Sequence, residues 1–170
     1  MGCCCKDSSC EANKPKAETP CPRCGVVGRP VGDETLRAIL KAGAAESLLG
    51  VERRFCRTQS CEVLYYGEDG RFVEKSAATV RVGAKETEDP VPLCYCFNHT
   101  LADIRREVQE TGSSTVADRI AAEIRADKCE CEVKNPSGAC CLGEVRKATK
   151  EVQEAIAGGE RQPGSASPKK

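Results

Sequence analysis

The chain has 170 residues, 14 of them cysteine, and its 26 basic residues balance 26 acidic ones. A formal net charge of zero leaves no basic face for displacing counterions from nucleic acid, so no nucleic acid is expected as a partner. Three Tyr, three Phe and no Trp provide few platforms for base stacking. Apolar runs stay well short of the roughly 18 residues of a membrane span, so no membrane insertion is expected.

The amino-terminal residues 1–5 carry three cysteines but lack the apolar core of a secretory signal. Position 6 is Lys6, so the serine or threonine of a myristoylation pattern is missing as well. We therefore expect a cytoplasmic protein, in which thiols stay reduced. In that compartment, 14 cysteines in 170 residues indicate metal ligation rather than a disulfide framework.

In chain order, the first predicted segments are a tail and a small mixed domain. Residues 1–19 are polar and rich in cysteine, which is typical of a flexible tail. Residues 20–90 combine short strands with one helical piece, for which Asp33 is a candidate N-cap. The apolar positions of this predicted helix are Leu36, Ile39 and Leu40.

The same domain is expected to contain a β-hairpin. Aromatic and β-branched residues at 63–66 and 71–73 flank a glycine-containing loop at 67–70. Residues 79–82 favour a further strand. Residues 86–92 predict an extended acidic linker, because each proline pushes the residue before it out of the helical conformation.

From residue 94 onward the apolar residues recur at helical spacing. Gly112 is the predicted end of a first helix, and Ser113 and Ser114 are candidate caps of a second. Residues 91–157 therefore predict a small helical domain, followed by a disordered tail over residues 158–170. The three apolar stripes are Leu101, Ile104 and Val108; Val116, Ile120 and Ile124; and Leu142, Val145, Val152 and Ile156.

The first cysteine motif has the spacing of a zinc ribbon. A C-x2-C pair, Cys21 and Cys24, is followed after 31 residues by a C-x4-C pair, Cys56 and Cys61. Tetrahedral zinc commonly takes four thiolates from two such knuckles. Gly25 tolerates the tight turn that aims backbone N–H groups at the sulfurs. Because four thiolates leave no open coordination position, we expect this zinc to be structural.

The second cysteine motif is typical of an iron–sulfur site. Cys94 and Cys96 lie in an apolar stretch, residues 93–97, that is expected to be extended. Residues i and i+2 of a strand project from one face with Cα atoms about 6.6 Å apart, so two thiolates so placed can close on one iron. The second iron needs another pair, and the Asn-Pro-Ser-Gly turn at 135–138 can fold Cys131 toward Cys141. We expect amides of that turn to donate to cluster sulfur.

Taken together, these motifs resemble a known family. Cys94-Tyr-Cys96 and the Asn-Pro-Ser-Gly-x-Cys-Cys-Leu-Gly block at 135–143 resemble the cluster segment of bacterioferritin-associated-ferredoxin-like (BFD-like) domains. The variant that they resemble is the one found in CopZ-type copper metallochaperones. The resemblance continues upstream through residues 55–63, 81–86 and 90–94, and covers residues 21 to about 150.

The resemblance implies an α+β protein in which a small zinc-ribbon β domain, residues 20–90, precedes a small helical BFD-like [2Fe–2S] domain, residues 91–157. It implies a role in copper handling, with a copper-transporting ATPase or a separate copper-binding domain as partner. Full-length members continue into a heavy-metal-associated domain with a Met-x-Cys-x-x-Cys copper loop, which this sequence lacks. Carried over by motif, the cluster ligands are Cys94, Cys96, Cys131 and Cys141, and the zinc ligands are Cys21, Cys24, Cys56 and Cys61.

Six cysteines remain outside these two sets. Cys129 and Cys140 adjoin the implied ligands, so either they replace Cys131 or Cys141 in register or they are packing thiols. The other four are clustered thiols that suit soft Cu⁺, or they belong to an exposed tail without a fixed role. These four are Cys3, Cys4, Cys5 and Cys10.

We therefore expect a redox accessory protein or metallochaperone that is not a substrate-transforming enzyme. Its [2Fe–2S] cluster would move single electrons, for example to reduce Cu(II) to Cu(I). The alternative is a zinc-ribbon module that binds nucleic acid or protein and uses both metal centres only as structural supports. Neutral net charge and few aromatics disfavour this alternative.

Overall fold

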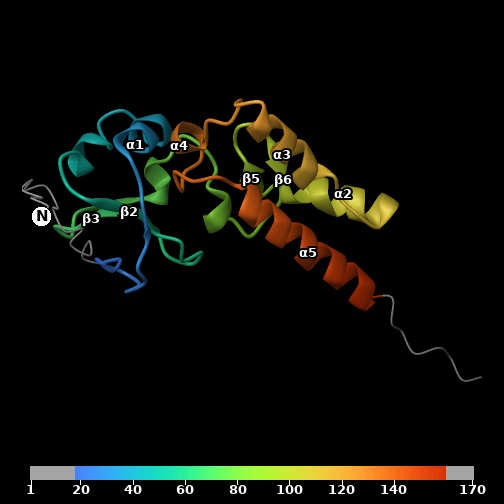
Figure 1. Cartoon of the computed structure of the whole chain (residues 1–170). Helices are drawn as coiled ribbons and strands as arrows, with labels where there is room; N and C mark the ends of the chain where they lie inside the picture. Colours follow the sequence, from blue (N-terminus) through green and yellow to red (C-terminus); the bar gives the residue numbers. More distant parts are fainter. Residues whose placement is uncertain (1–17, 160–170) are drawn as a thin grey trace, which may run out of the picture.

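The computed structural model describes residues 18–159 (Figure 1). The predicted tails at 1–19 and 158–170 therefore lie almost entirely outside the described residues, as do the four cysteines of the first ten positions. In the described part of the chain, no helix combines the length and apolar character that a membrane crossing requires.

The first half of the fold is built on a four-stranded antiparallel sheet. Its strands are β1 (Arg29–Pro30), β2 (Arg53–Phe55), β3 (Val63–Gly67) and β4 (Phe72–Glu74), in the spatial order β1-β2-β3-β4. Strands β3 and β4 form the predicted hairpin, which is confirmed, and Gly70 in its loop adopts a positive φ of 83°. A left-handed residue in such a loop favours glycine, which has no Cβ to clash with the backbone.

Strand β3 is buried along its whole length. Leu64 and Tyr65 join the main core, where the Tyr65 ring lies 5.9 Å from that of Phe55. Val63 and Tyr66 instead pack with the cysteines of the first motif. Because both of its faces are covered, β3 connects the hydrophobic core to the thiol cluster.

Helix α1 (Asp33–Ile39) covers the sheet and buries Leu36 and Ile39, as its apolar spacing predicts. The predicted N-cap is wrong by one residue. Gly32 occupies the cap position without a side-chain hydrogen bond, and Asp33 lies in the first turn. There its carboxylate forms an ion pair with Arg53 of β2 and complements the positive end of the helix.

The predicted strand at 79–82 is absent from the described residues. The backbone N–H of Thr79 donates instead to the carbonyl of Ile39, at 2.8 Å, and Lys41 N–H donates to Ala77, at 2.9 Å. This stretch therefore hydrogen bonds to the backbone at the carboxyl end of α1 rather than adding a strand to the sheet. The short 3₁₀ turns of this half are η1 (Glu46–Leu48), η2 (Lys75–Ala77) and η3 (Gly83–Lys85).

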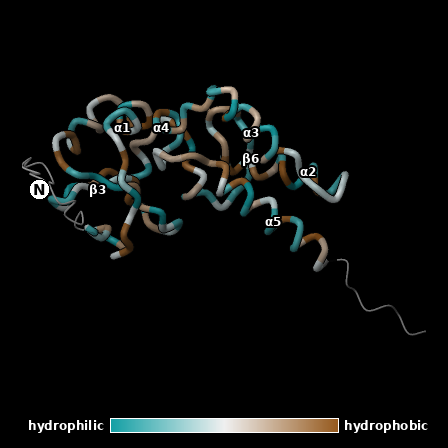
Figure 2. Tube along the Cα trace, in the orientation of Figure 1, coloured by the Kyte–Doolittle hydropathy of each residue, from teal (hydrophilic) through white to brown (hydrophobic). Residues whose placement is uncertain are grey.

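The second half contains a two-stranded ribbon, three longer helices and one short helix. The elements are β5 (Pro92–Cys94), β6 (His99–Thr100), α2 (Leu101–Thr111), α3 (Val116–Arg125), α4 (Cys131–Lys134) and α5 (Leu142–Gly159). The three predicted stripes are confirmed, because α2 and α3 pack on α5 through Ile104, Ile120 and Val145. Hydrophobic and hydrophilic residues alternate along α5, as expected for a helix with one face on a core (Figure 2). The mixed α+β class is likewise confirmed.

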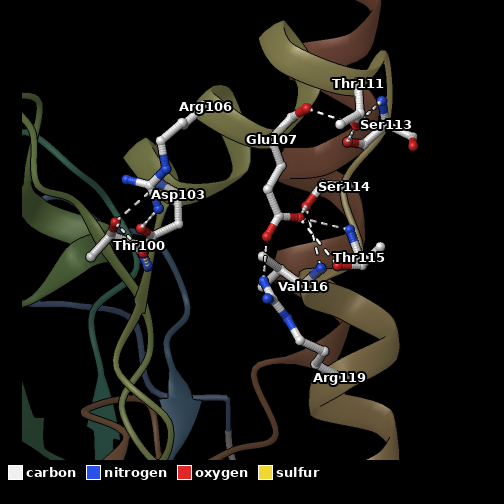
Figure 3. Close-up of polar contacts among 10 residues, drawn as sticks. All are labelled: Thr100, Asp103, Arg106, Glu107, Thr111, Ser113, Ser114, Thr115, Val116 and Arg119. Atoms are coloured by element: carbon white, nitrogen blue, oxygen red, sulfur yellow. Dashed lines mark hydrogen bonds and ion pairs between the residues drawn. The ribbon is translucent and has the colours of Figure 1, made fainter.

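The start of α2 and the turn into α3 are fixed by side-chain caps (Figure 3). Thr100 and Asp103 form a reciprocal capping box at α2. Gly112 ends this helix in the left-handed conformation, as predicted. The N-cap of α3 is Thr115 rather than Ser113 or Ser114. The Glu107 carboxylate holds this cap, since it accepts from the Thr115 N–H and the Ser114 hydroxyl.

The two halves share an interface made by the loop that precedes α5. Helix α1 lies beside the short α4 (Figure 1), and the Thr35 hydroxyl donates to the carbonyl of Glu132 at 2.5 Å. The hydroxyl of the fully buried Tyr65 donates to the carbonyl of Pro136 at 2.7 Å. Residues 131–138 are therefore held against the first half although they lie between helices α3 and α5 of the second.

Candidate metal centres

The four cysteines of the first motif converge. Their Sγ atoms all lie within 4.8 Å of one another. The Sγ of Cys21 is 3.9 Å from that of Cys61, and the Sγ of Cys24 is 3.6 Å from that of Cys56. Four sulfurs about 2.3 Å from a central metal ion form a tetrahedron with edges of about 3.8 Å. The spacing of these thiols thus fits one tetrahedral ion.

Local backbone structure places both knuckles. Cys21 and Cys24 bracket a tight turn in which Gly25 N–H donates to the Cys21 carbonyl at 2.9 Å. Gly25 has φ 72°, which is the conformation expected for it. Cys56 follows the last residue of β2, and Cys61 lies two residues before β3. The sheet therefore fixes the second knuckle opposite the first.

The thiols of this site differ in acidity. Burial alone raises the pKa of Cys24, but hydrogen bonds from the Thr58 hydroxyl, at 3.2 Å, and the Val26 backbone N–H outweigh it and lower the pKa to about 6. Burial raises the pKa of Cys21 to about 12, and it also raises the pKa of Cys61. Of these three thiols Cys24 therefore ionises most readily, and a bound metal has to displace protons from Cys21 and Cys61, because metal ligands must be deprotonated. Sequence reasoning missed Thr58, whose position inside the C-x4-C knuckle was the available signal.

The second group of thiols lies at the junction of β5, α4 and the start of α5. The Sγ atoms of Cys96, Cys129 and Cys131 lie within 4.8 Å of one another. Cys96 and Cys131 are separated by 3.8 Å, and Cys129 and Cys131 by 3.2 Å. The side chains of Cys94 and Cys141 interact, and this interaction lowers the pKa of Cys94 to about 6 and raises that of Cys141. Cys94, Cys131 and Cys141 belong to the buried core of the second half, and the half-buried Cys96 and Cys129 pack against it.

The pairing of these thiols differs from the strand-based expectation. Strand β5 ends at Cys94, and Cys96 lies in the turn that leads to β6, where Asn98 has φ 55°. The two side chains therefore do not project from one strand face. Each instead contacts a cysteine of the distal segment, so that Cys94 pairs with Cys141 and Cys96 with Cys131.

Backbone N–H groups surround this second group of sulfurs. Glu130 N–H donates to the Sγ of Cys96 at 3.3 Å, and the backbone of Cys141 partly offsets the burial that raises the pKa of Cys131. The Asn-Pro-Ser-Gly turn does not supply such donors among the hydrogen bonds of the described residues. Its Asn135 side chain closes the turn on Ala139 and Ser137, and its Pro136 carbonyl faces Tyr65.

The two further cysteines of this region have different surroundings. Cys140 is exposed, although it adjoins Cys141. Cys129 is half-buried and touches the sulfur of Cys131. The geometry thus favours Cys129 over Cys140 as an alternative ligand.

A short segment connects the two thiol groups. Gly83 N–H donates to the hydroxyl of Tyr95 at 2.8 Å, and that hydroxyl donates to the carbonyl of Arg81 at 3.1 Å. Tyr95 lies between Cys94 and Cys96 in the chain. At the other end of η3, the Lys85 ammonium donates to the carbonyl of Cys61 at 2.9 Å. Residues 81–85 therefore contact both the first group and the turn that carries the second.

The fold and the two thiol groups define a cysteine-rich metal-binding protein in two parts. A zinc-binding domain family of the CopZ type matches residues 18–79. The copper chaperone CopZ of Archaeoglobus fulgidus is 35% identical over 145 residues, which span 78% of this chain and 68% of that protein. The X-ray structure of the Archaeoglobus fulgidus CopZ N-terminal domain is similar with a TM-score of 0.62 and 34% identity, over 75% of this chain and 95% of that one.

The chain therefore belongs to the CopZ family. The family resemblance predicted from the motifs is confirmed, and the first half of the chain is a zinc-binding domain.

Proposed function

We propose that this protein is a cytoplasmic metal-handling accessory of copper transfer with two metal centres. It holds Zn²⁺ at Cys21, Cys24, Cys56 and Cys61, and a [2Fe–2S] cluster at Cys94, Cys96, Cys131 and Cys141. The observation that carries the proposal is the convergence of thiols from distant segments into two groups, in a chain of the CopZ family.

The zinc centre has a structural role. Its four thiolates complete a tetrahedron, so no position stays open for a substrate. It fastens the turn at 21–25 to the sheet, in a domain whose apolar core is small. Domains of this size commonly depend on a metal for stability.

The second group fits a diiron cluster held by two cysteine pairs. The 3.8 Å between Cys96 and Cys131 equals the edge expected for two thiolates on one tetrahedral iron, and the contact of Cys94 with Cys141 supplies the second pair. When bound, such a cluster accepts and donates single electrons. The protein's own groups prepare the site, because buried apolar side chains exclude water and backbone N–H groups stabilise thiolate charge.

The proposed substrate is copper. A reduced cluster held by these cysteines would be oxidised by one electron and would convert one Cu(II) to one Cu(I), the form that thiolate ligands transfer. The Archaeoglobus relative is a copper chaperone, which supports a copper-transporting ATPase or a separate copper-binding domain as recipient.

A test compares the same full chain in two redox states. Protein reduced with dithionite and freed of excess reductant is mixed anaerobically with Cu(II), and Cu(I) is measured with a chromophoric chelator. Untreated oxidised protein is the matched control, because it carries the same cysteines, which themselves reduce some Cu(II). The proposal predicts one additional Cu(I) for each reduced cluster, with loss of the reduced-cluster EPR signal. Equal Cu(I) yields from both states would exclude electron delivery to copper.

A further inference from the structure

Lys85 is the one charged side chain that is buried among residues 18–159, with only 4% of its surface exposed. Its ammonium donates hydrogen bonds to the carbonyls of Thr58, at 2.7 Å, and Cys61, at 2.9 Å. Within the described part of the chain, none of its contacts is an ion pair with a carboxylate. Burying a cation without an opposite charge is strongly unfavourable, so a nearby negative charge is required.

The two carbonyls identify where that charge comes from. Both belong to the second zinc knuckle, between Cys56 and Cys61, and Cys61 contributes a sulfur to the four-thiol group. Thr58 bridges the ammonium and the site directly, since its carbonyl accepts from Lys85 while its hydroxyl lies 3.2 Å from the Sγ of Cys24. Four thiolates outweigh the double charge of Zn²⁺, so a loaded centre is negatively charged.

We propose that Lys85 is the counter-ion of the zinc centre. This role rests on the zinc ligands named under the proposed function. Lys85 is then a positioning residue that favours the zinc-loaded, four-thiolate form of the site. The ammonium neutralises part of the excess negative charge from behind the second knuckle. It also orients the Thr58–Cys61 backbone by binding two of its carbonyls. Outer groups of this kind commonly alter metal affinity about ten- to hundredfold.

Three substitutions separate the charge of Lys85 from its hydrogen bonds and its packing. Lys85→Arg keeps the charge, Lys85→Gln keeps a donor without charge, and Lys85→Met keeps only the apolar stem. Lys75→Gln is the matched control, because Lys75 lies near the same knuckle but is exposed and pairs with Glu62 at 3.5 Å. The dissociation constant for Zn²⁺ is measured on each full chain by competition with a chromophoric chelator. Co²⁺ substitution reports on tetrahedral thiolate coordination.

The counter-ion role predicts that Lys85→Gln and Lys85→Met raise the Zn²⁺ dissociation constant about ten- to hundredfold. Lys85→Arg and Lys75→Gln should stay within about threefold of the wild type, and every variant should keep the tetrahedral Co²⁺ spectrum. If Lys85→Met does not fold, the comparison of Lys85→Gln with Lys85→Arg decides.

Wild-type affinity in Lys85→Gln would overturn the counter-ion role, as would an equal loss in Lys85→Arg and Lys85→Gln. A wild-type chain that binds no zinc would instead refute the proposed site itself. The two failures are therefore distinguishable.

Discussion

The hydroxyl of Tyr65 offers a test of how the two halves of the protein depend on each other. Tyr65→Phe removes one oxygen and leaves the fully buried ring in place. The change deletes the 2.7 Å hydrogen bond to Pro136 and leaves a buried carbonyl without its donor. Such a loss costs about 1–3 kcal/mol. At about 2–4 °C per kcal/mol for a protein of this size, the melting temperature should fall by about 2–12 °C.

The same substitution should act on the second centre, although Tyr65 belongs to the first half. The Pro136 carbonyl lies between Cys131 and Cys141 in the chain, so freeing it loosens the loop that carries both. We expect faster loss of iron to a chelator in Tyr65→Phe. The matched control is Tyr66→Phe, whose hydroxyl bonds Gly28 and Thr19 of the first half and no residue of the second half within residues 18–159.

The assay combines thermal unfolding of the metal-loaded chains with the rate of iron release. Tyr66→Phe should lose stability by a similar amount without accelerating iron release. The reasoning would be refuted if the two variants released iron at the same rate, or if Tyr65→Phe unfolded at the wild-type temperature.

Three further predictions test individual contacts. In Gly83→Ala a Cβ would lie 1.9 Å from the Pro92 carbonyl oxygen, so the free energy of unfolding measured in urea should fall by about 1–3 kcal/mol. Gly143→Ala, which has open space around its Cβ, should show no such fall. Cys141→Ser should abolish iron binding, whereas Cys140→Ser should leave the iron content unchanged. Iron retained by Cys141→Ser would by itself contradict the proposed ligand set. Burial raises the pKa of Glu107, but hydrogen bonds from Thr115 and Ser114 and the charge of Arg119 outweigh burial and hold the pKa below its usual value of 4.5. The ionised Glu107 therefore stabilises the fold at neutral pH, and this contribution is lost as pH falls through the folded-state pKa. The difference in unfolding free energy between wild type and Glu107→Gln should therefore shrink below about pH 4.5, and a difference independent of pH would contradict this.

Local patterns were sufficient to predict elements whose signals lie within a few residues. The hairpin of β3 and β4 follows from aromatic and β-branched residues around a glycine turn, and the end of α2 follows from Gly112. The convergence of Cys21, Cys24, Cys56 and Cys61 was predictable, because the spacing of metal-ligand motifs is imposed by coordination geometry rather than by the surrounding fold.

Elements determined by distant partners were not predictable in this way. Residues 79–82 have strand propensity, but Thr79 bonds the end of α1, a contact that depends on tertiary packing. Helix α4 has only four residues and no periodicity to reveal it. The turn at Cys96 depends on the left-handed Asn98, so the alternation expected of an extended strand was misleading there.

The sulfur pairing and the role of Lys85 required the fold. Spacing alone indicated that Cys94 and Cys96 share an iron, whereas contacts with Cys131 and Cys141 depend on how the loop at 131–141 returns to β5. Lys85 resembles any surface lysine in sequence, and only its burial beside the second knuckle distinguishes it.

The occupancy of the two thiol groups is the most direct test of the account. The full chain is purified without oxygen, its zinc and iron are quantified, and the dithionite-reduced sample is examined by low-temperature EPR. Two irons and one zinc for each chain, with a rhombic S = 1/2 signal after reduction, are the predicted result. Zinc in both groups with no iron and no such signal would contradict it, and would leave a protein whose metals only support its fold.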